Sequence, residues 1–366
     1  MTAMDAPRFV DAPALSAEAA TGVRFSKPTK RADASGISKR TLANLPDRIL
    51  QFMAVMTYSS LMYINLAIHL VLLNYWRIVW PFVLCYWTYV FLLDMSTPYT
   101  GGTDRARFFR DWSFWRHFRD YFSAELVKTA DLDPEGNFLF GHHPHGIYCY
   151  GLLPNFITDW GGFSKLFPGI TLRVTTLDVN WSIPIWREMQ MALSAVSVSA
   201  KSLKHILTQK GPGWSAMVVI GGAEEALLAY PGTNDIILNR RKGFVKLAIQ
   251  TGASLVPVFT FGENDLFWQV NDDNAPVIRS YQRRFAKLLT FSVPLMWGRF
   301  GLFFLPRKVK LVSVVGKPIP VRQQDSPSRE YIAQMHDTYV VALMKLYDDH
   351  KEKYAPSRIR DLRIVK

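Results

Sequence analysis

A long apolar stretch near the N-terminus constrains this chain more than any other feature. Between Ile49 and Leu93 the sequence carries a single formal charge, Arg77. The first apolar run, Ile49 to Leu73, is longer than the roughly 20 residues that a membrane-spanning helix needs. After a polar and aromatic break around Arg77 comes a shorter run, Ile78 to Leu93, which contains Pro81 and lies near the lower limit for a span.

Basic residues flank both ends of this stretch and indicate its orientation. They are Lys39, Arg40 and Arg48 before it and Arg105, Arg107 and Arg110 after it. Because positive charge favours the cytosolic side of a membrane, we expect a two-helix transmembrane hairpin over residues 48–95, with cytosolic outer ends and a tip near Trp76 and Arg77. The second limb could instead re-enter the membrane. The alternative is a pair of buried core helices, which rarely run so long without a charged face.

The composition limits the classes of partner that the chain can bind. The 366 residues carry a net charge of +13, and 49% of them are hydrophobic. Such a positive balance indicates an anionic partner, which could be a lipid surface, a nucleic acid or a phosphate-bearing substrate. Nucleic acid fits poorly, because the basic residues are spread along the chain and no recognition motif is present. The two cysteines, Cys85 and Cys149, exclude a disulfide scaffold and a four-cysteine zinc site.

The segments on either side of the hairpin differ in character. Residues 1–47 are polar and contain no apolar run, so we predict a disordered cytosolic arm without a signal peptide. After Pro98 the apolar runs shorten to strand length and alternate with helical patterns. The expected strands are Phe138–Phe140, Met217–Ile220, Ser254–Phe261 and Val309–Val315, and the expected helices are Ser199–Gln209, Gly243–Thr251 and Ser328–Lys353. Over residues 96–366 we therefore predict an α/β domain with a mixed, mostly parallel sheet flanked by helices.

Two details of this domain carry expectations of their own. Pro257 lies inside a predicted strand, which indicates an edge strand or a bulge, since proline cannot donate to a central ladder. The apolar patch from Leu288 to Leu305 is broken by Pro294 and Arg299. We expect it to lie at a membrane interface or to line a substrate tunnel, with plain core as the alternative.

The densest polar cluster, Gly141 to Gly146, directly follows the first predicted strand of the domain. Its three histidines are His142, His143 and His145. Active sites of α/β proteins usually lie at strand ends, so one histidine could be a general base for an attacking hydroxyl. The cluster could also bind a metal or be a polar loop. A metal site is the weakest of the three, because only Cys149 adds a ligand nearby and no acid follows at short spacing.

A histidine base usually has a carboxylate partner, and the best candidates follow another predicted strand. Glu224 and Glu225 come after the diglycine Gly221-Gly222, whose lack of side chains would permit close approach of a ligand to the backbone. The alternative is a helix start, where acids complement the helix dipole.

A basic segment opens a predicted helix further along the chain. It contains Arg241 and Lys242, followed by Gly243 and Phe244. Cations beside the free N–H groups of a helix N-terminus form a phosphate site, although a charge run is more often a solvated face.

These residues resemble the type-two diacylglycerol acyltransferase family, which includes monoacylglycerol and wax-alcohol acyltransferases. The matching blocks span about 250 residues and include Arg116–Phe122, His143–Gly146, Phe167–Gly169, Gly221–Leu227, Arg241–Ala248, Leu255–Val258, Phe261–Asp265 and Val315–Ile319. The family usually has proline where this chain has Ser123 and glycine where it has Ser194. An aromatic residue is usual where it has Met189, and His142 also departs from the pattern.

The resemblance implies a glycerolipid-acyltransferase-like fold and an acyl-CoA-dependent O-acyltransferase that esterifies diacylglycerol to triacylglycerol. It implies that His145 is the base, that Glu225 rather than Glu224 holds its imidazole, and that His143 positions the substrate or the loop. Backbone N–H groups near Gly146 would bind the oxyanion. The implied substrate-binding residues are Gly146, Gly221, Gly222, Arg241, Lys242, Gly243 and Phe244, with no metal and no cofactor beyond acyl-CoA as co-substrate.

The expected partners are acyl-CoA, diacylglycerol and membrane lipid, with no nucleic acid, and the sequence leaves a homo-oligomer open. The expected location is the endoplasmic reticulum membrane with a cytosolic catalytic domain, and lipid droplets are a second location. Monoacylglycerol or a fatty alcohol is the alternative acceptor. A non-catalytic lipid-droplet coat protein and a metal-dependent lipid hydrolase are the alternatives from other functional classes.

Overall fold

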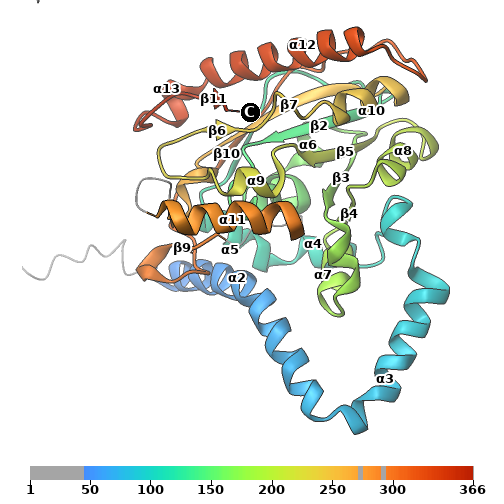
Figure 1. The fold of residues 1–366 in the computed structure, drawn as a ribbon, viewed down its shortest axis with the longest axis vertical. Coiled ribbons are helices and arrows are strands. Elements are labelled where there is room, and N and C mark those ends of the chain that lie inside the picture. The colour runs from blue at the N-terminus through green and yellow to red at the C-terminus, as the bar shows by residue number, and fades with distance from the viewer. Residues whose placement is uncertain (1–44, 271–274, 290–293, 366) are drawn as a thin grey trace, which may run out of the picture. The chain divides into compact units, whose positions relative to one another are not determined.

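The computed structural model describes residues 45–270, 275–289 and 294–365, so nearly all of the predicted arm lies outside the described residues. It opens with two long helices, α2 (Leu45–Asn74) and α3 (Trp76–Tyr89), which meet at Tyr75. Figure 1 shows them as the two limbs of a V. Both helical stretches, Leu45–Asn74 and Trp76–Tyr99, are long and apolar enough to cross a membrane. Only 11% of the most apolar window of each is buried, so neither is a core helix.

The first half of α2 belongs to the packed domain as much as to the hairpin. Ala54 and Val55 are buried. The Tyr58 ring lies edge-on to two rings of α5 (Ser113–Tyr121), with centroids 5.7 Å from Trp115 and 5.2 Å from Phe118. The hairpin is therefore joined to the α/β part by an aromatic contact.

A seven-stranded sheet forms the centre of the α/β part. Its order is β1 (Glu125–Lys128), β10 (Val312–Val315), β7 (Ser254–Phe261), β2 (Phe138–His143), β5 (Trp214–Val219), β3 (Thr171–Thr176) and β4 (Val196–Ser197). All neighbours are parallel except β10 and β7. The predicted mixed, mostly parallel sheet is confirmed.

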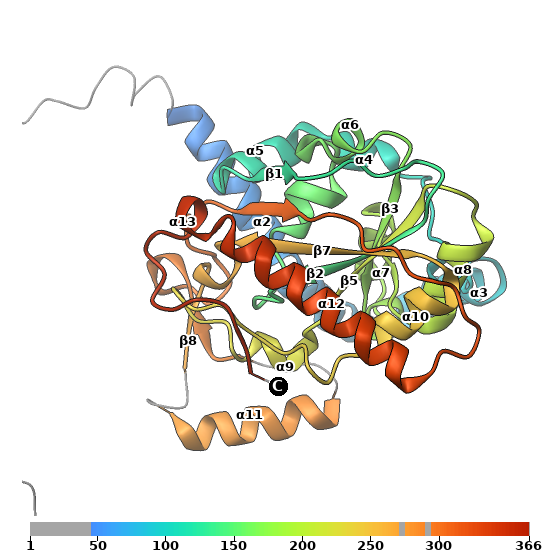
Figure 2. The ribbon, with the colours of Figure 1, turned by 90° about the horizontal axis from the view of Figure 1, so that it is seen from above.

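Helices cover both faces of this sheet (Figure 2). One face carries α8 (Ala200–Gln209), α10 (Gly243–Thr251) and α12 (Arg329–Asp348), and the other carries α5, α6 (Phe163–Leu166) and the π-helix η3 (Leu153–Ile157). Side chains of β2 alternate between the two cores, since Leu139 packs with the first set and Phe140 with the second.

The remaining elements are shorter. They are η1 (Val90–Asp94), η2 (Thr97–Tyr99), α4 (Arg107–Asp111), η4 (Asp159–Gly161), η5 (Asp178–Ser182), α7 (Trp186–Ala192), α9 (Gly222–Ala226), η6 (Glu263–Asp265), α11 (Pro276–Leu289), η7 (Arg299–Gly301) and α13 (Lys351–Tyr354). Two-stranded ladders join β6 (Asp235–Ile236) to β11 (Arg363–Ile364) and β8 (Trp268–Gln269) to β9 (Met296–Trp297).

The edge position predicted for Pro257 is wrong, but the alternative, a bulge, agrees with the register beside it. Its strand, β7, is central and pairs with both β2 and β10. The Pro257 carbonyl accepts a hydrogen bond from the Gly316 N–H at 2.8 Å, one residue beyond the end of β10. Val258 pairs with Val315, but Leu255 bridges Ile319, so one extra residue lies in the partner segment beside Pro257 and interrupts the regular ladder.

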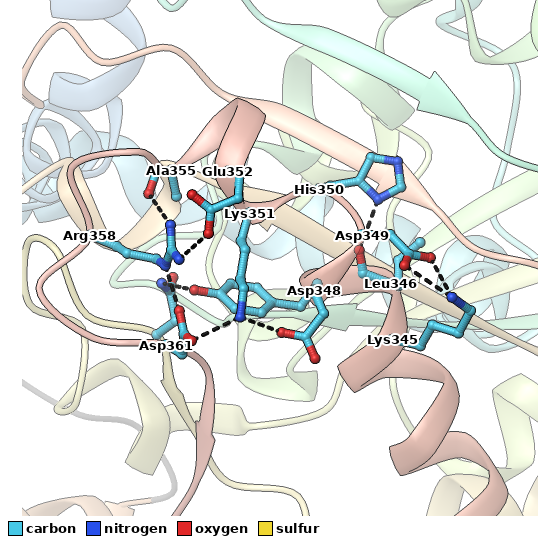
Figure 3. A network of polar contacts seen from close by, with 12 residues as sticks. Lys345, Leu346, Asp348, Asp349, His350, Lys351, Glu352, Ala355, Arg358 and Asp361 are labelled. Atoms are coloured by element: carbon cyan, nitrogen blue, oxygen red, sulfur yellow. Dashed lines mark hydrogen bonds and ion pairs between the residues drawn. The ribbon is translucent and has the colours of Figure 1, made fainter.

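The C-terminal tail is tied to the end of α12 by exposed ion pairs (Figure 3). Lys351 Nζ lies 2.7 Å from Asp348 and 2.8 Å from Asp361. Beyond this network, Arg363 donates two hydrogen bonds to Asp235 of β6, at 2.9 and 3.0 Å. Individual exposed pairs contribute little stability. Together they fix β6, which immediately precedes a residue of the candidate site, Ile237.

Candidate active site

The predicted histidine and acidic segments meet at one edge of the sheet. β2 and β5 are parallel neighbours, and their carboxyl ends lead into His143 and α9 respectively. We call residues 143–151 the histidine loop. It begins at the end of β2, and Glu225 of α9 reaches it from β5.

The Glu225 carboxylate holds backbone rather than the imidazole. Its Oε1 accepts the His145 N–H at 2.6 Å, and its Oε2 accepts the Ile237 N–H at 2.6 Å. Both oxygens are therefore taken by backbone donors, and the expected bond to the His145 ring is not the one formed. Burial raises the pKa of Glu225 to about 7, even though both N–H groups favour the ionised form.

Gly221 provides the space for this carboxyl group. A Cβ at Gly221 would lie 2.1 Å from the Glu225 side chain. The glycine expected to contact substrate thus contacts Glu225. Gly222 has φ +65°, and a Cβ there would lie 3.4 Å from Arg241 Nη2.

The His145 imidazole is oriented by its own loop. Its Nδ1 lies 3.0 Å from the Gly146 carbonyl, and because a carbonyl only accepts, Nδ1 carries the proton. In the neutral ring the lone pair is then on Nε2. Burial, together with the Arg241 charge, lowers the pKa of His145, so the ring is neutral near pH 7. The residue is partly exposed. A neutral, accessible imidazole with a free Nε2 can accept a proton from a hydroxyl.

His143 is buried and anchors α12 to β2. Tyr339 of α12 donates to the Gly141 carbonyl at 3.1 Å, and its oxygen lies 3.0 Å from His143 Nε2. The hydroxyl has one proton, so Nε2 is the donor in the second bond. Burial lowers the pKa of His143 to about 3. A Cβ at Gly141 would lie 2.1 Å from the Tyr339 oxygen, which explains the glycine.

His142 joins a separate buried network. Its Nε2 lies 2.8 Å from the Thr260 hydroxyl, which lies 2.8 Å from that of Ser313. The Asn155 amide donates to the same Ser313 oxygen at 2.8 Å. Burial lowers the pKa of His142 to about 3. Of the three histidines, only His145 is therefore accessible.

A second buried carboxylate, Glu263, was not singled out from the sequence. Its oxygens accept the N–H groups of Tyr150 and Gly151 at 2.7 and 2.8 Å. A Cβ at Gly146 would lie 2.6 Å from Glu263 Cγ, so the two residues fit closely. Burial raises the pKa of Glu263 to about 7. An acid two residues beyond the buried strand β7 was the available signal.

The basic segment divides into residues with different surroundings. Arg241 donates to the Gly221 carbonyl at 3.0 Å and is partly buried, whereas Lys242 and Gly243 are exposed at the start of α10. Phe244 is a core residue whose ring lies 4.9 Å from that of Tyr339, so it does not face a substrate. Glu224 forms an ion pair with Arg240. Among the described residues, no group of three or more His, Cys, Asp or Glu could hold a metal ion.

Comparison with known proteins decides the family. A family model described as diacylglycerol acyltransferase matches residues 71–365. The chain belongs to the diacylglycerol acyltransferase family. It is 42% identical over 297 residues to "2-acylglycerol O-acyltransferase 1" of Bos taurus, covering 80% of this chain and 86% of that protein. It is 40% identical over 326 residues to "Diacylglycerol O-acyltransferase 2A" of Umbelopsis ramanniana, covering 87% and 91%.

Membership of this family makes the chain an acyltransferase. Relatives named for either acceptor are about equally similar to it, so the acceptor is not decided by similarity. Among solved structures, the acyltransferase PlsC of Thermotoga maritima is similar with a TM-score of 0.39 and 13% identity, covering 88% of this chain and 100% of that chain.

Proposed function

We propose that this protein transfers the acyl group of acyl-CoA to the free hydroxyl of diacylglycerol, giving triacylglycerol and CoA. The observation that carries the proposal is the partly exposed His145 imidazole, whose protonated Nδ1 leaves Nε2 free to accept a hydroxyl proton. Family membership supports acyl transfer as the reaction that uses this base.

In this mechanism, His145 Nε2 removes the acceptor proton as the hydroxyl oxygen attacks the thioester carbonyl. The tetrahedral intermediate then collapses, the C–S bond breaks, and the imidazolium returns the proton to the CoA sulfur. The Gly146 N–H, which has no acceptor among the described residues, is the candidate donor to the oxyanion. Glu225 acts indirectly, by fixing the backbone directly after Pro144 and hence the place of the imidazole.

Arg241, Lys242 and Gly243 are proposed to bind the phosphates of CoA. Arg241 is held beside the diglycine, close enough to His145 for its charge to lower the pKa of that ring. Lys242 is exposed at the first turn of α10, where a helix N-terminus adds N–H donors. The hairpin would keep this site at the endoplasmic reticulum membrane, where the apolar acceptor resides, with lipid droplets as a second location.

Monoacylglycerol is the second candidate acceptor, because relatives named 2-acylglycerol O-acyltransferase are 42% identical to the chain. The deciding experiment offers the purified full chain labelled acyl-CoA with diacylglycerol, 2-monoacylglycerol and a fatty alcohol in competition. We expect kcat/KM to be highest for diacylglycerol. A higher value for monoacylglycerol or the alcohol would overturn the acceptor. Absence of any ester product from folded protein would favour the coat-protein alternative, and loss of activity with a chelator would favour the hydrolase.

A further inference from the structure

A basic cavity at the start of α2 is not used by the proposed reaction. Its volume is about 530 Å³. It is lined by Arg48, Ile49 and Phe52 of α2, by Tyr121 at the end of α5, and by Arg299, Phe300 and Lys308 from the segment that follows β9. We call this cavity the basic pocket.

Three cations converge on the basic pocket without a balancing acid. Among the described residues, no carboxylate forms an ion pair with Arg48, Arg299 or Lys308. Lys308 Nζ lies 5.6 Å from the centre of the Tyr121 ring and 3.3 Å from the Gln51 amide oxygen. Desolvation and the charges of Arg48 and Arg299 lower the pKa of Lys308. Mutual repulsion of this kind is relieved when an anion binds.

The rim of the pocket is apolar and exposed. Ile49 is 53% exposed and Phe300 is 72% exposed. Phe300 has φ +59°, a left-handed conformation that bulky residues rarely adopt, and the Arg299 guanidinium lies 4.8 Å from its ring. Exposed apolar side chains interleaved with cations are typical of a surface that meets lipid headgroups.

The pocket lies on the element that leads into the hairpin. α2 supplies part of its lining and continues through Tyr63, whose ring lies edge-on to that of Phe303 at 5.1 Å. In Figure 1, β9 lies beside the first half of α2, and α2 then turns away toward the hairpin tip. The segment after β9 and the base of the hairpin therefore share one side of the domain, the side that the hairpin brings to the membrane.

We propose that the basic pocket binds the phosphate headgroup of one anionic phospholipid from the membrane that holds the hairpin. Arg48, Arg299 and Lys308 would surround the phosphate, and the acyl chains would lie along Ile49 and Phe300. The proposal does not depend on acyl transfer, because it concerns a separate cavity and a lipid that is not consumed.

The phosphates of acyl-CoA are the competing source of negative charge. The ring of Phe122 lies between Tyr121 of the pocket and Tyr150 of the histidine loop, with centroid separations of 4.8 and 5.7 Å. The pocket is thus separated from the histidine loop by the Phe122 ring and lies on the hairpin side. This placement favours a lipid of the membrane over a substrate bound at His145.

Lipid retention by the purified full chain tests the proposal. Native mass spectrometry from a neutral detergent would titrate phosphatidic acid, phosphatidylcholine of matched chains, palmitoyl-CoA and inorganic phosphate. The test variant is Arg48→Gln/Arg299→Gln/Lys308→Gln. The control variant, Lys201→Gln/Lys204→Gln/Lys317→Gln, removes the same charge from exposed lysines elsewhere. One Lys or Arg near an anionic lipid contributes about a fivefold factor in affinity, so we expect about 100-fold weaker binding of phosphatidic acid by the test variant.

We expect the control variant to match the unsubstituted chain, and phosphatidylcholine to bind all three proteins weakly and alike. Equal retention of phosphatidic acid by test variant and unsubstituted chain would overturn the proposal. So would displacement of the lipid by equimolar palmitoyl-CoA, which would make the pocket a CoA site, or by equimolar inorganic phosphate. Should the triple variant unfold, Lys308→Gln should weaken binding about fivefold while Lys308→Arg retains it.

Discussion

At the scale of single residues, two buried carboxylates hold the histidine loop through hydrogen bonds to its backbone. Glu225 binds the N–H of His145 near the start of the loop, and Glu263 binds those of Tyr150 and Gly151 at its end. Side-chain oxygens thus substitute for secondary structure in a segment that forms no helix or strand after His143. The loop can be irregular and still fix one imidazole.

We expect His145→Ala to lower kcat by about 10²–10⁴-fold, the typical value of general-base catalysis, with little change in thermal stability. His143→Ala should instead lower thermal stability and have the smaller effect on kcat. It removes a buried ring bonded to Tyr339, so unfolding should become easier by about 2–4 kcal/mol, with a smaller loss of kcat in the folded fraction. Initial rates and melting curves of both variants check this. Near-normal turnover by His145→Ala would rule out that base.

Glu225→Gln should lower kcat by about 10–100-fold with an almost unchanged KM for acyl-CoA. One amide N–H would face a backbone N–H, and a mismatched buried group costs about 1–3 kcal/mol. Glu224→Gln is the matched control and should change kcat less than twofold, since Glu224 pairs with the exposed Arg240. If Glu225 acts by placing the imidazole ring, adding Glu225→Gln to His145→Ala should lower kcat little further. Additive losses would show that Glu225 acts elsewhere.

Glu263 should make stability fall as pH rises. Its pKa is about 7 in the folded chain and lower when unfolded, so the native state binds the extra proton between about pH 4.5 and 7. His142 and His143 act in the opposite sense, because unfolded histidine binds a proton below about pH 6.5 and the native rings do not. The Glu263→Gln substitution removes the contribution of Glu263 to the pH dependence of stability and leaves that of the two histidines. Relative to the unsubstituted chain, its stability should rise with pH by about 1 kcal/mol per unit.

Apparent melting temperatures in detergent at pH 5.0 to 7.5 measure this difference, which should amount to a few degrees per pH unit. Glu135→Gln, an amide substitution at an exposed position, should give a curve parallel to that of the unsubstituted chain. A parallel curve for Glu263→Gln would mean that Glu263 is ionised throughout.

The sequence predicted which segments meet at this edge of the sheet, but not the hydrogen bonds between them. Parallel strands end at the same edge, which predicts that the segments after β2 and β5 meet. The hydrogen-bond partner of Glu225 depends on the direction of the N–H groups in the loop. Residue types alone do not determine this direction. The Tyr339–His143 bond joins residues 196 positions apart, which no local pattern reveals. Phe244, which the resemblance assigned to substrate binding, packs in the core against Tyr339.

At the scale of elements, the alternation of strands and helices was predictable because each buried run has its own period. The four expected strands correspond to β2, β5, β7 and β10, and the three expected helices to α8, α10 and α12. Strands β3 and β4 lack a distinct apolar run, and the ladders of two residues depend on contacts distant in sequence.

The turn after α5 carries an element-scale prediction. Ser123 has φ +45°, and its N–H donates to the Asp120 carbonyl at 3.1 Å. Proline, which the family usually has here, fixes φ near −65° and has no N–H. Ser123→Pro should therefore destabilise this chain by about 2–3 kcal/mol, and Ser123→Gly should leave it equally or more stable. Thermal melting of both variants decides; an unchanged melting temperature for Ser123→Pro would mean that the turn readily takes another conformation.

At the scale of the whole molecule, the hairpin is shorter than its helices suggest. The α2 helix has 30 residues, but those up to Asn65 contact the domain: the Tyr58 ring packs on Trp115, and the buried Asn65 amide donates to the Pro184 carbonyl at 3.1 Å. The part beyond these contacts, from Leu66 to Asn74, is roughly 14 Å long at 1.5 Å per residue, about half of the roughly 30 Å hydrocarbon core. The tip at Tyr75 should therefore lie within lipid, while the basic flanks hold both outer ends on one side.

Labelling with a membrane-impermeant maleimide in sealed microsomes tests this topology. In a Cys85→Ala/Cys149→Ala background the chain has no other cysteine. Each variant then carries one introduced cysteine, and its labelling reports on that position alone. Ser38→Cys in the arm and Ser326→Cys in the catalytic domain should both react from the cytosolic side, because positive flanks favour the cytosol. Tyr75→Cys should react only after detergent is added. Protection of Ser38→Cys beside reactive Ser326→Cys would place the two ends on opposite sides of the membrane and exclude a hairpin.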